Sequence, residues 1–307
     1  MTVSPAAIEL VLDRSGSMAT PIPGGTRMTA LQSAVSMFSD LVIPDTGFSM
    51  GSVQFDDQFA VLTALQNFDA TQQNTIKTDA NTLTPRGFTS IGGGLKLGQS
   101  SMSASSQARK VAIVFTDGFE NTPPTIASIE PGVLTAGTEV YAVGLGDPAF
   151  LSVAALSELA ASSNGKFFQT TDPLVLRKQF VEILADAFRQ NMAADPLLTL
   201  QQGVPVTVPV NITNCEGRIS FVLLWEDLWV NAGQTPQNLI VQSINGVNVS
   251  EIGPAILLPD GRVFAVGGTG HTAIFDPSQP VASAWSNGPD TFRRTQAIRL
   301  LRPACSR

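Results

Sequence analysis

The 307-residue chain has few of the residues on which several functional classes depend. Its two cysteines, Cys215 and Cys305, are too few for a disulfide scaffold or a zinc ribbon. In a reducing cytosol we expect two free thiols, with a pair between them as the alternative. The single histidine, His271, lies far in sequence from any candidate serine nucleophile, so a serine–histidine–aspartate triad would have to form across two domains. We interpret His271 as a turn or packing residue.

Positive charge is also scarce. The chain has 18 Lys and Arg residues against 25 Asp and Glu residues, which gives a formal net charge of −7. No basic stripe is available to neutralise phosphates, and this excludes general nucleic-acid binding. The acidic surplus suits a protein that recruits cations.

Long hydrophobic runs are missing too. No apolar run approaches the roughly 18 to 20 residues that a membrane-spanning helix needs, so we expect no membrane span. The N-terminus shows no basic segment ahead of a separate apolar stretch, which favours a cytoplasmic protein, or a secreted one if a signal peptide has been removed. Abundant alanine and more arginine than lysine loosely favour a bacterial source.

What is present, from residue 6 to about 190, is an alternation of short apolar runs and segments of helical period. Strands are expected at 7–12, 48–55, 59–63, 110–116, 139–145 and 166–170, and helices at 27–41, 71–82, 90–105, 125–136, 151–162 and 173–191. The near-continuous apolar strands indicate burial on both faces, as in a parallel sheet. Residues 56–58 indicate a hairpin, so one edge strand is expected to be antiparallel. The alternation predicts a doubly wound, Rossmann-like α/β domain over 1–192.

The pattern changes near 193–200, where alternating Val, Thr and Ile begin, interrupted by Gly, Pro and Asn-Gly. This pattern predicts a smaller all-β, sandwich-like domain over 196–307. Within it, 257–290 resembles a single kelch-type propeller repeat. One repeat cannot close a propeller, so we expect a glycine-rich pair of hairpins inside an ordinary β domain. A blade completed by other subunits, or the start of a longer propeller, is the alternative.

Small oxygen-bearing side chains follow the predicted strands. Asp13, Ser15 and Ser17 come directly after the first strand, Thr89 lies in a glycine-rich stretch ahead of a helix, and Asp117 follows the most hydrophobic strand. In open α/β sheets, ligands bind outside the carboxyl ends of the strands, so we expect these five side chains at one edge. Taken alone, the Asp-x-Ser-x-Ser run fits a metal cradle, a phosphate-handling site or a capped turn.

The three motifs in this order resemble a von Willebrand factor A domain over roughly residues 5 to 190. That family carries a metal ion-dependent adhesion site. The resemblance implies that Asp13, Ser15, Ser17, Thr89 and Asp117 hold a metal. In the family, an Asp or Glu side chain of a partner protein completes the metal's shell, and the resemblance implies the same here.

The chemistry of these side chains agrees with that implication. Carboxylate and hydroxyl oxygens suit a hard cation such as Mg²⁺, and two carboxylates balance a divalent charge. A metal with few anionic ligands keeps an open position, where the carboxylate of a partner can displace water. Mn²⁺ or Ca²⁺ would use the same oxygens with looser geometry.

Four charged side chains near the motifs also need an interpretation. Arg14 is expected to be a surface residue at the rim, able to steer an acidic partner. Glu120 is expected to be exposed to solvent, with a secondary ligand or a rim charge as the alternatives. Asp56 and Asp57 are expected at a hairpin tip at the opposite end of the sheet, and no role is assigned to them.

An enzyme is not expected. The chain lacks the P-loop motif for nucleotide phosphates, and Ser15 stands where a phosphotransferase with an aspartate after its first strand usually needs a second acid. We therefore hypothesise a divalent-metal-dependent protein-binding module. The alternative is a homo-oligomer, a self-assembling ring or filament in which a neighbouring copy supplies the carboxylate. A metal-dependent hydrolase with Glu120 as the base ranks below both.

Overall fold

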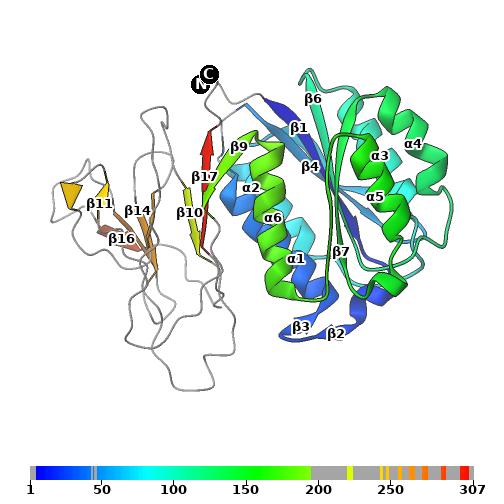
Figure 1. The fold of residues 1–307 in the computed structure, drawn as a ribbon, viewed down its shortest axis with the longest axis horizontal. Coiled ribbons are helices and arrows are strands. Elements are labelled where there is room, and N and C mark those ends of the chain that lie inside the picture. Colours follow the sequence, from blue (N-terminus) through cyan, green and yellow to red (C-terminus); the bar gives the residue numbers. More distant parts are fainter. Residues whose placement is uncertain are drawn as a thin grey trace. The chain divides into compact units, whose positions relative to one another are not determined.

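A computed structural model describes residues 5–42, 44 and 47–194, together with eight short strands between residues 220 and 303. The chain divides into two compact units, Met1–Phe188 and Arg189–Arg307. All the helices among the described residues belong to the first unit (Figure 1). None of these helices is long and apolar enough to cross a membrane.

Six strands form the central sheet of the first unit, in the order β5-β4-β1-β6-β7-β8. They are β1 (Ala6–Asp13), β4 (Ser49–Phe55), β5 (Phe59–Asn67), β6 (Arg109–Thr116), β7 (Thr138–Leu145) and β8 (Phe167–Thr170). The edge strand β5 runs antiparallel to β4, and all other neighbours are parallel. In this register Leu10 lies beside Ser52 on one side and Ile113 on the other. The carboxyl ends of the five parallel strands therefore meet at one edge of the sheet.

Six α-helices among the described residues cover the two faces of this sheet. They are α1 (Arg27–Leu41), α2 (Ala70–Asn81), α3 (Ile91–Ser103), α4 (Ile126–Thr135), α5 (Val153–Ser162) and α6 (Pro173–Ala187). Helices α1, α2 and α6 lie on one face and α3, α4 and α5 on the other (Figure 1). A short hairpin, β2 (Pro21–Ile22) and β3 (Gly25–Thr26), leads from β1 into α1.

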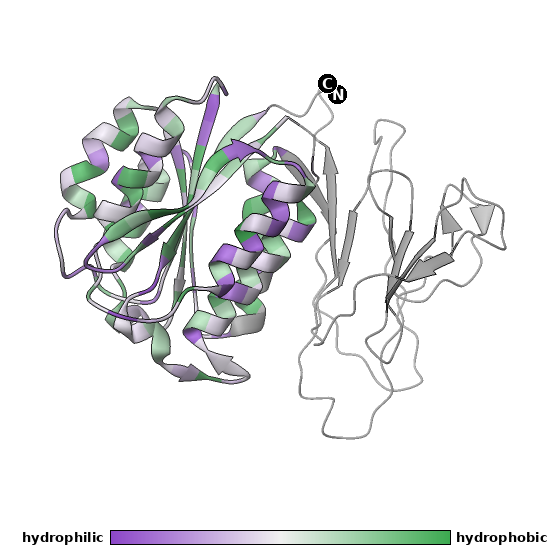
Figure 2. Cartoon of the chain, turned by 180° about the vertical axis from the view of Figure 1, so that it is seen from behind, coloured by the Kyte–Doolittle hydropathy of each residue, from purple (hydrophilic) through white to green (hydrophobic). Residues whose placement is uncertain are grey.

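Burial on both faces explains why the inner strands β1, β6 and β7 are almost continuously apolar. All eight residues of β1 are buried, and hydrophobic strands lie between helices of mixed hydropathy (Figure 2). On one face the rings of Phe38, Phe115 and Phe180 pack together, with centroids 6.1 Å apart for both Phe38–Phe180 and Phe115–Phe180. On the other face, Val11 and Val114 pack in one cluster with Leu95 of α3 and residues of α4 and α5.

Glycines allow α3 to approach the sheet and α4 closely. A Cβ atom on Gly92 would lie 2.4 Å from the backbone of Thr125, and one on Gly94 would lie 2.6 Å from the ring of Phe55. Gly92–Gly94 belong to the first turns of α3, in agreement with the helix predicted over 90–105. This close packing fixes the position of the loop that precedes the helix.

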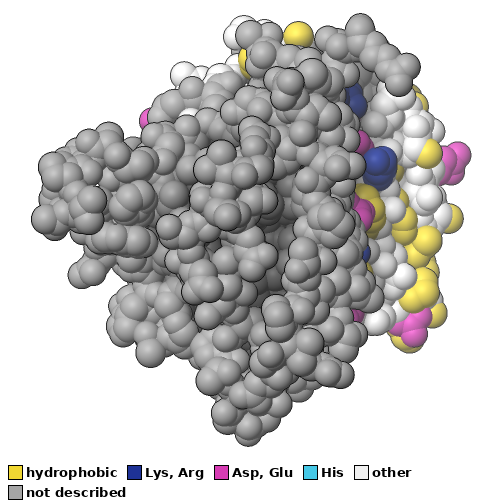
Figure 3. All heavy atoms as spheres, turned by 60° about the vertical axis from the view of Figure 1, so that its left-hand side comes forward, with side chains coloured by type: hydrophobic (Ala, Val, Ile, Leu, Met, Phe, Trp, Pro, Cys, Tyr) yellow, Lys and Arg dark blue, Asp and Glu magenta, His cyan; other side chains and the backbone are white. Residues whose placement is uncertain are grey.

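Charged side chains are sparse on one described face of the first unit. On the face in Figure 3, uncharged polar and hydrophobic atoms cover most of the described surface, and charged side chains are scattered. This distribution agrees with a charged content of 14%.

The predicted doubly wound α/β fold with a mostly parallel sheet is confirmed. The helix predicted over 173–191 is too long, because α6 ends at Ala187 and the chain then turns at Arg189, whose φ is +53°. Gln190 already begins a strand of the second unit.

The described strands of the second unit pair antiparallel. Their order is β10-β17-β9 in one sheet, β11-β12 in a second and β13-β14-β15-β16 in a third. They are β9 (Gln190–Ala194), β10 (Ser220–Leu223), β11 (Ser243–Ile244), β12 (Val247–Asn248), β13 (Ala255–Leu257), β14 (Val263–Val266), β15 (Thr272–Phe275), β16 (Trp285–Asn287) and β17 (Ile298–Pro303). A sandwich of sheets stays a prediction, since it depends on residues outside those described. Cys215, His271 and Cys305 also lie outside them.

Candidate metal site

The two aspartates of the motifs lie at the same edge of the sheet because β1 and β6 are parallel neighbours. Asp13 is the last residue of β1, and Asp117 directly follows β6. The register pairs Leu12 with Phe115, which places Thr116 level with Asp13. The Thr116 hydroxyl donates a hydrogen bond to Asp13 Oδ2 at 2.6 Å. The end of β6 thus holds the first carboxylate in place.

The two serines form a polar chain between the aspartates. The Ser15 backbone N–H donates to Asp13 Oδ1 at 2.7 Å, which turns the chain sharply after β1. The short 3₁₀ helix η1 (Gly16–Ala19) follows. The hydroxyl oxygens of Ser15 and Ser17 lie 3.1 Å apart, and the Ser17 hydroxyl donates to Asp117 Oδ1 at 2.7 Å. Four of the five predicted residues are therefore linked by direct contacts.

Thr89 reaches the same place from its own loop. The Gly16 N–H donates to the Gly87 carbonyl at 3.1 Å, which ties the serine loop to the Thr89 loop. Gly87 has a φ of +68°, and a Cβ there would overlap Asp57. Gly118 lies between two of the hydroxyls, because an ideal Cβ on it would be 3.4 Å from Ser17 Oγ and 3.6 Å from Thr89 Oγ. All five side chains converge.

Most of these oxygen-bearing side chains are buried, and this disfavours negative charge on the carboxyl groups. Asp13, Ser15, Thr89 and Asp117 are buried, with 0, 1, 4 and 1% exposure, whereas Ser17 is exposed and marks the open side. Burial, and then the neighbouring Asp117 carboxylate, raise the pKa of Asp13 from 3.8 to about 7. A divalent cation would balance both carboxylates, and every donor is a hard oxygen. The donor set therefore fits such an ion.

The described residues contain no cluster of three or more His, Cys, Asp or Glu side chains that could hold a metal. A metal at this edge would therefore depend on hydroxyl oxygens as well as on carboxylates. This is consistent with Mg²⁺, which commonly keeps several neutral oxygen ligands.

Arg27 is a member of the site that the sequence does not reveal. Its Nη1 donates to Asp117 Oδ2 at 2.8 Å and to the Asp117 carbonyl at 3.4 Å. Arg27 is the first residue of α1, whose start is fixed by a capping box between Thr26 and Thr29. No motif marks this arginine, because the contact joins positions 90 residues apart. Arg27 holds Asp117 from the side opposite Ser17.

The expectation that Asp56 and Asp57 lie at the opposite end of the sheet is wrong. Their hairpin follows β4, and β4 is parallel to β1, so the hairpin lies at the carboxyl edge with the site. Asp56 is fully buried, and its Oδ2 accepts a hydrogen bond from Arg86 Nε at 2.6 Å. Its carbonyl accepts from the Ser90 N–H at 2.9 Å. Asp56 thus anchors both ends of the Thr89 loop.

Arg14 is less exposed than the surface residue at the rim that the sequence predicts. Its side chain is 15% exposed and lies 3.6 Å from Asp56 Oδ2. It donates to Gln54 Oε1 at 2.9 Å and to the Thr84 carbonyl at 3.2 Å. Arg14 therefore braces the serine loop against neighbouring loops.

The expectation of a solvent-exposed Glu120 is likewise wrong. This half-buried carboxylate accepts hydrogen bonds from the backbone N–H groups of Gly92 and Ile126, both at 2.7 Å. Burial raises its pKa, and these two hydrogen bonds oppose the rise. A carboxylate at two helix N-termini is favourable for both helix dipoles. Glu120 joins the starts of α3 and α4.

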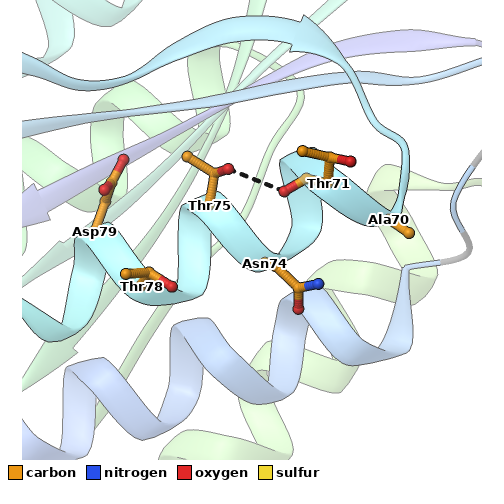
Figure 4. A pocket seen from close by; sticks show the side chains of 6 residues that line it. All are labelled: Ala70, Thr71, Asn74, Thr75, Thr78 and Asp79. Atoms are coloured by element: carbon orange, nitrogen blue, oxygen red, sulfur yellow. Dashed lines mark hydrogen bonds between the residues drawn. The ribbon is translucent and has the colours of Figure 1, made fainter.

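A surface depression of about 400 Å³ lies elsewhere, along α2 (Figure 4). All of its lining residues come from that helix: Ala70, Thr71, Asn74, Thr75, Thr78 and Asp79. Asp79 accepts a hydrogen bond from the Thr63 hydroxyl at 2.7 Å, and Thr75 donates to the Thr71 carbonyl at 2.9 Å. The described residues that line this depression all come from one helix, whereas polar side chains of three separate segments converge at the sheet edge, so the sheet edge is the better candidate site.

Comparisons with known proteins agree with the fold. The family model of the von Willebrand factor type A domain matches residues 8–182. A von Willebrand factor type A structure from Catenulispora acidiphila is 17% identical, with a TM-score of 0.54 over 98% of this chain and 57% of that one. Proximal thread matrix protein 1 from the mussel byssus, solved with a zinc-occupied MIDAS motif, is 23% identical, with a TM-score of 0.52 over 60% of this chain and 46% of that one.

This chain thus spans little more than half of the first of these structures and less than half of the second. A search of curated protein sequences returns no match. The comparisons give no support to a kelch repeat within 257–290.

Proposed function

Because the chain belongs to the von Willebrand factor type A domain family, we propose that it is a protein-binding module that works through a divalent metal. The metal would be held by Asp13, Ser15, Ser17, Thr89 and Asp117. The observation that carries this proposal is their convergence, from three separate segments, at one sheet edge with an open side at Ser17. Domains of this family mediate protein–protein interactions.

When bound, the metal supplies a Lewis-acidic position that a carboxylate of the partner can occupy. Residues of the chain itself position the metal ligands. Thr116 and Arg27 orient the two aspartates, and Asp56 and Arg14 hold the loops that carry Thr89 and Ser15. Mg²⁺ suits these oxygens best, Mn²⁺ and Ca²⁺ can use them, and zinc occupies the corresponding motif in the mussel protein.

A role without catalysis is part of this proposal. Metal-assisted hydrolysis needs a general base beside the metal, and Glu120 was the candidate from the sequence. Its two oxygens instead accept hydrogen bonds from the starts of α3 and α4. This use of Glu120 favours binding over hydrolysis.

Calorimetric titration of the full chain with Mg²⁺, Mn²⁺ and Zn²⁺ tests the proposal. We expect saturable binding of one ion per chain, lost in Asp13→Ala. Asp40→Asn is the matched control, since this exposed aspartate pairs with Lys77 on the surface and should leave binding intact. Absence of binding in the unmodified chain, or equal affinity in Asp13→Ala, would overturn the proposal. Native mass spectrometry with Mg²⁺ and with EDTA then tests the alternative of self-assembly. Oligomers that form with Mg²⁺ and dissociate in EDTA would indicate that a second copy supplies the carboxylate, and a monomer in both conditions would leave another protein as its source.

A further inference from the structure

Exposed phenyl rings lie at the same edge of the sheet as the candidate metal site. Phe88, Phe119 and Phe150 expose 66, 52 and 65% of their surface, and Phe59 exposes 42%. They belong to four separate segments at the carboxyl edge of the sheet. We call these four rings the phenyl collar.

Two of the rings are next to proposed metal ligands. Phe88 directly precedes Thr89, on the loop that the Gly16 N–H holds through the Gly87 carbonyl. Phe119 comes two residues after Asp117. Neither ring helps to build the core, since more than half of each is in contact with solvent.

The other two rings are tied to the same edge by their neighbours. Phe150 ends the short 3₁₀ helix η2 (Pro148–Phe150), which follows β7. Ahead of η2, an ideal Cβ on Gly146 would lie 3.6 Å from the Asp117 carbonyl oxygen. Beyond it, the Ser152 hydroxyl accepts a hydrogen bond from the Glu120 N–H at 2.9 Å.

Phe59 follows the hairpin after β4, and its ring lies against the first turn of α3, 2.5 Å from an ideal Cβ on Gly93. The Ser90 N–H, just ahead of that turn, donates to the Asp56 carbonyl. All four collar residues are therefore held at the edge where the oxygens converge.

The phenyl collar and the oxygens at its centre favour a particular kind of binding partner. Phenyl rings in water gain free energy when a partner covers them, and aromatic residues are enriched at the centres of protein interfaces. The centre of this surface is a group of oxygens suited to a cation. The surface is therefore apolar around a centre that favours a carboxylate.

We propose that the phenyl collar selects a protein segment in which an Asp or Glu is flanked closely by large apolar side chains. This inference rests on the proposed function, because the carboxylate would reach the metal while the flanking side chains cover the rings. A lipid surface fits less well. The chain carries a net charge of −7, which opposes approach to anionic membranes.

A displayed library of 12-residue peptides with a fixed central Asp or Glu, selected on the full chain in Mg²⁺, tests the inference. We expect enrichment of Leu, Ile, Phe, Met or Trp within three positions of the fixed acid. The Phe88→Ser, Phe119→Ser double variant should bind the selected peptides about tenfold or more weakly, while its affinity for Mg²⁺ by calorimetry stays unchanged. Leu134→Ser is the matched control, because Leu134 is 38% exposed near the C-terminal end of α4, and it should bind as the unmodified chain does.

Peptides with polar or basic flanks would overturn the inference, as would equal affinity of the double variant and the unmodified chain. Binding to neutral lipid vesicles in place of the peptides would also overturn it. Phe150→Ser offers a second, independent variant, and thermal unfolding checks that each variant is folded. Peptide binding that survives EDTA and Asp13→Ala yet still needs Phe88 and Phe119 would refute the metal contact alone and leave the collar in place.

Discussion

Strand β1 carries two buried carboxyl groups in different surroundings. Glu9 and Asp13 are both fully buried, and as residues four apart on one strand they face the same side of the sheet. Burial raises the pKa of Glu9 from 4.5 to about 8 and contributes most to the rise of Asp13 to about 7. Glu9 accepts one hydrogen bond from the Ser101 hydroxyl at 2.9 Å, and its Oε1 has no partner.

The glycines around Glu9 show why it is not part of a site. A Cβ on Gly51 would lie 3.0 Å from Glu9 Oε2, and one on Gly98 would lie 3.1 Å from Glu9 Cγ. The carboxyl group itself fills the space that these glycines leave beneath α3. At Asp13, by contrast, a second carboxylate and three hydroxyls converge beside an open side. Burial alone therefore perturbs a carboxyl group, whereas a binding site needs converging donors and access.

The largest expected effect comes from Glu9→Gln. Between pH 4.5 and 8 the unfolded chain releases the Glu9 proton while the folded chain keeps it, so the contribution of Glu9 to the free energy of unfolding falls as the pH rises through this window. At about 1.4 kcal/mol per pKa unit, the fall is on the order of 5 kcal/mol. Urea unfolding across this range measures the effect. We expect the unmodified chain and Glu9→Gln to have similar free energies of unfolding at pH 4.5, and Glu9→Gln to be the more stable at pH 8.

Glutamine keeps the acceptor for Ser101, so the packing around position 9 changes little. The quantity to compare is the difference between the two pH profiles, because every other titrating group contributes equally to both. Parallel profiles would show that Glu9 does not hold its proton in the folded chain.

A smaller effect, stabilisation by Mg²⁺, distinguishes Glu9 from the carboxylates of the candidate metal site. At a free Mg²⁺ concentration 100 times the dissociation constant, binding should raise the free energy of unfolding by about 2.7 kcal/mol. We expect this increase in the unmodified chain and in Glu9→Gln, and none in Asp117→Asn. Urea unfolding with Mg²⁺ and with EDTA measures it. An increase that persists in Asp117→Asn would remove Asp117 from the site.

The smallest expected effect concerns the support of the site. Asp56→Asn should weaken Mg²⁺ binding about tenfold, because the charge that anchors the Thr89 loop through Arg86 and Arg14 is lost. Arg86→Gln should weaken it less, since 60% of the Arg86 side chain is exposed to water. Calorimetry ranks the variants. A larger loss of Mg²⁺ affinity in Arg86→Gln than in Asp56→Asn would show that Arg86 contributes more than Asp56 to holding the Thr89 loop. Equal Mg²⁺ affinity in the unmodified chain and both variants would show that the loop needs neither residue as an anchor.

Much of the α/β unit could be predicted because its signals are local. A strand buried on both faces is apolar along its length, and a helix has an apolar period, so the strands and helices lie within a few residues of where they were expected. The errors arose where local signals compete. The helix expected to reach 191 ends at Ala187, because the chain turns at Arg189 and Gln190 begins a strand.

The sequence by itself determined the alternation of strands and helices and the five oxygen-bearing residues of the motifs, because strand period, burial and motif order are properties of neighbouring residues. Only the tertiary structure decided the roles of Arg27, Asp56 and Glu120. Their contacts join loops between about 30 and 90 residues apart, and these loops meet because the strands are parallel and in a particular register. Side chains that a motif does not mark enter the site only when the packed sheet brings their loops to the same edge.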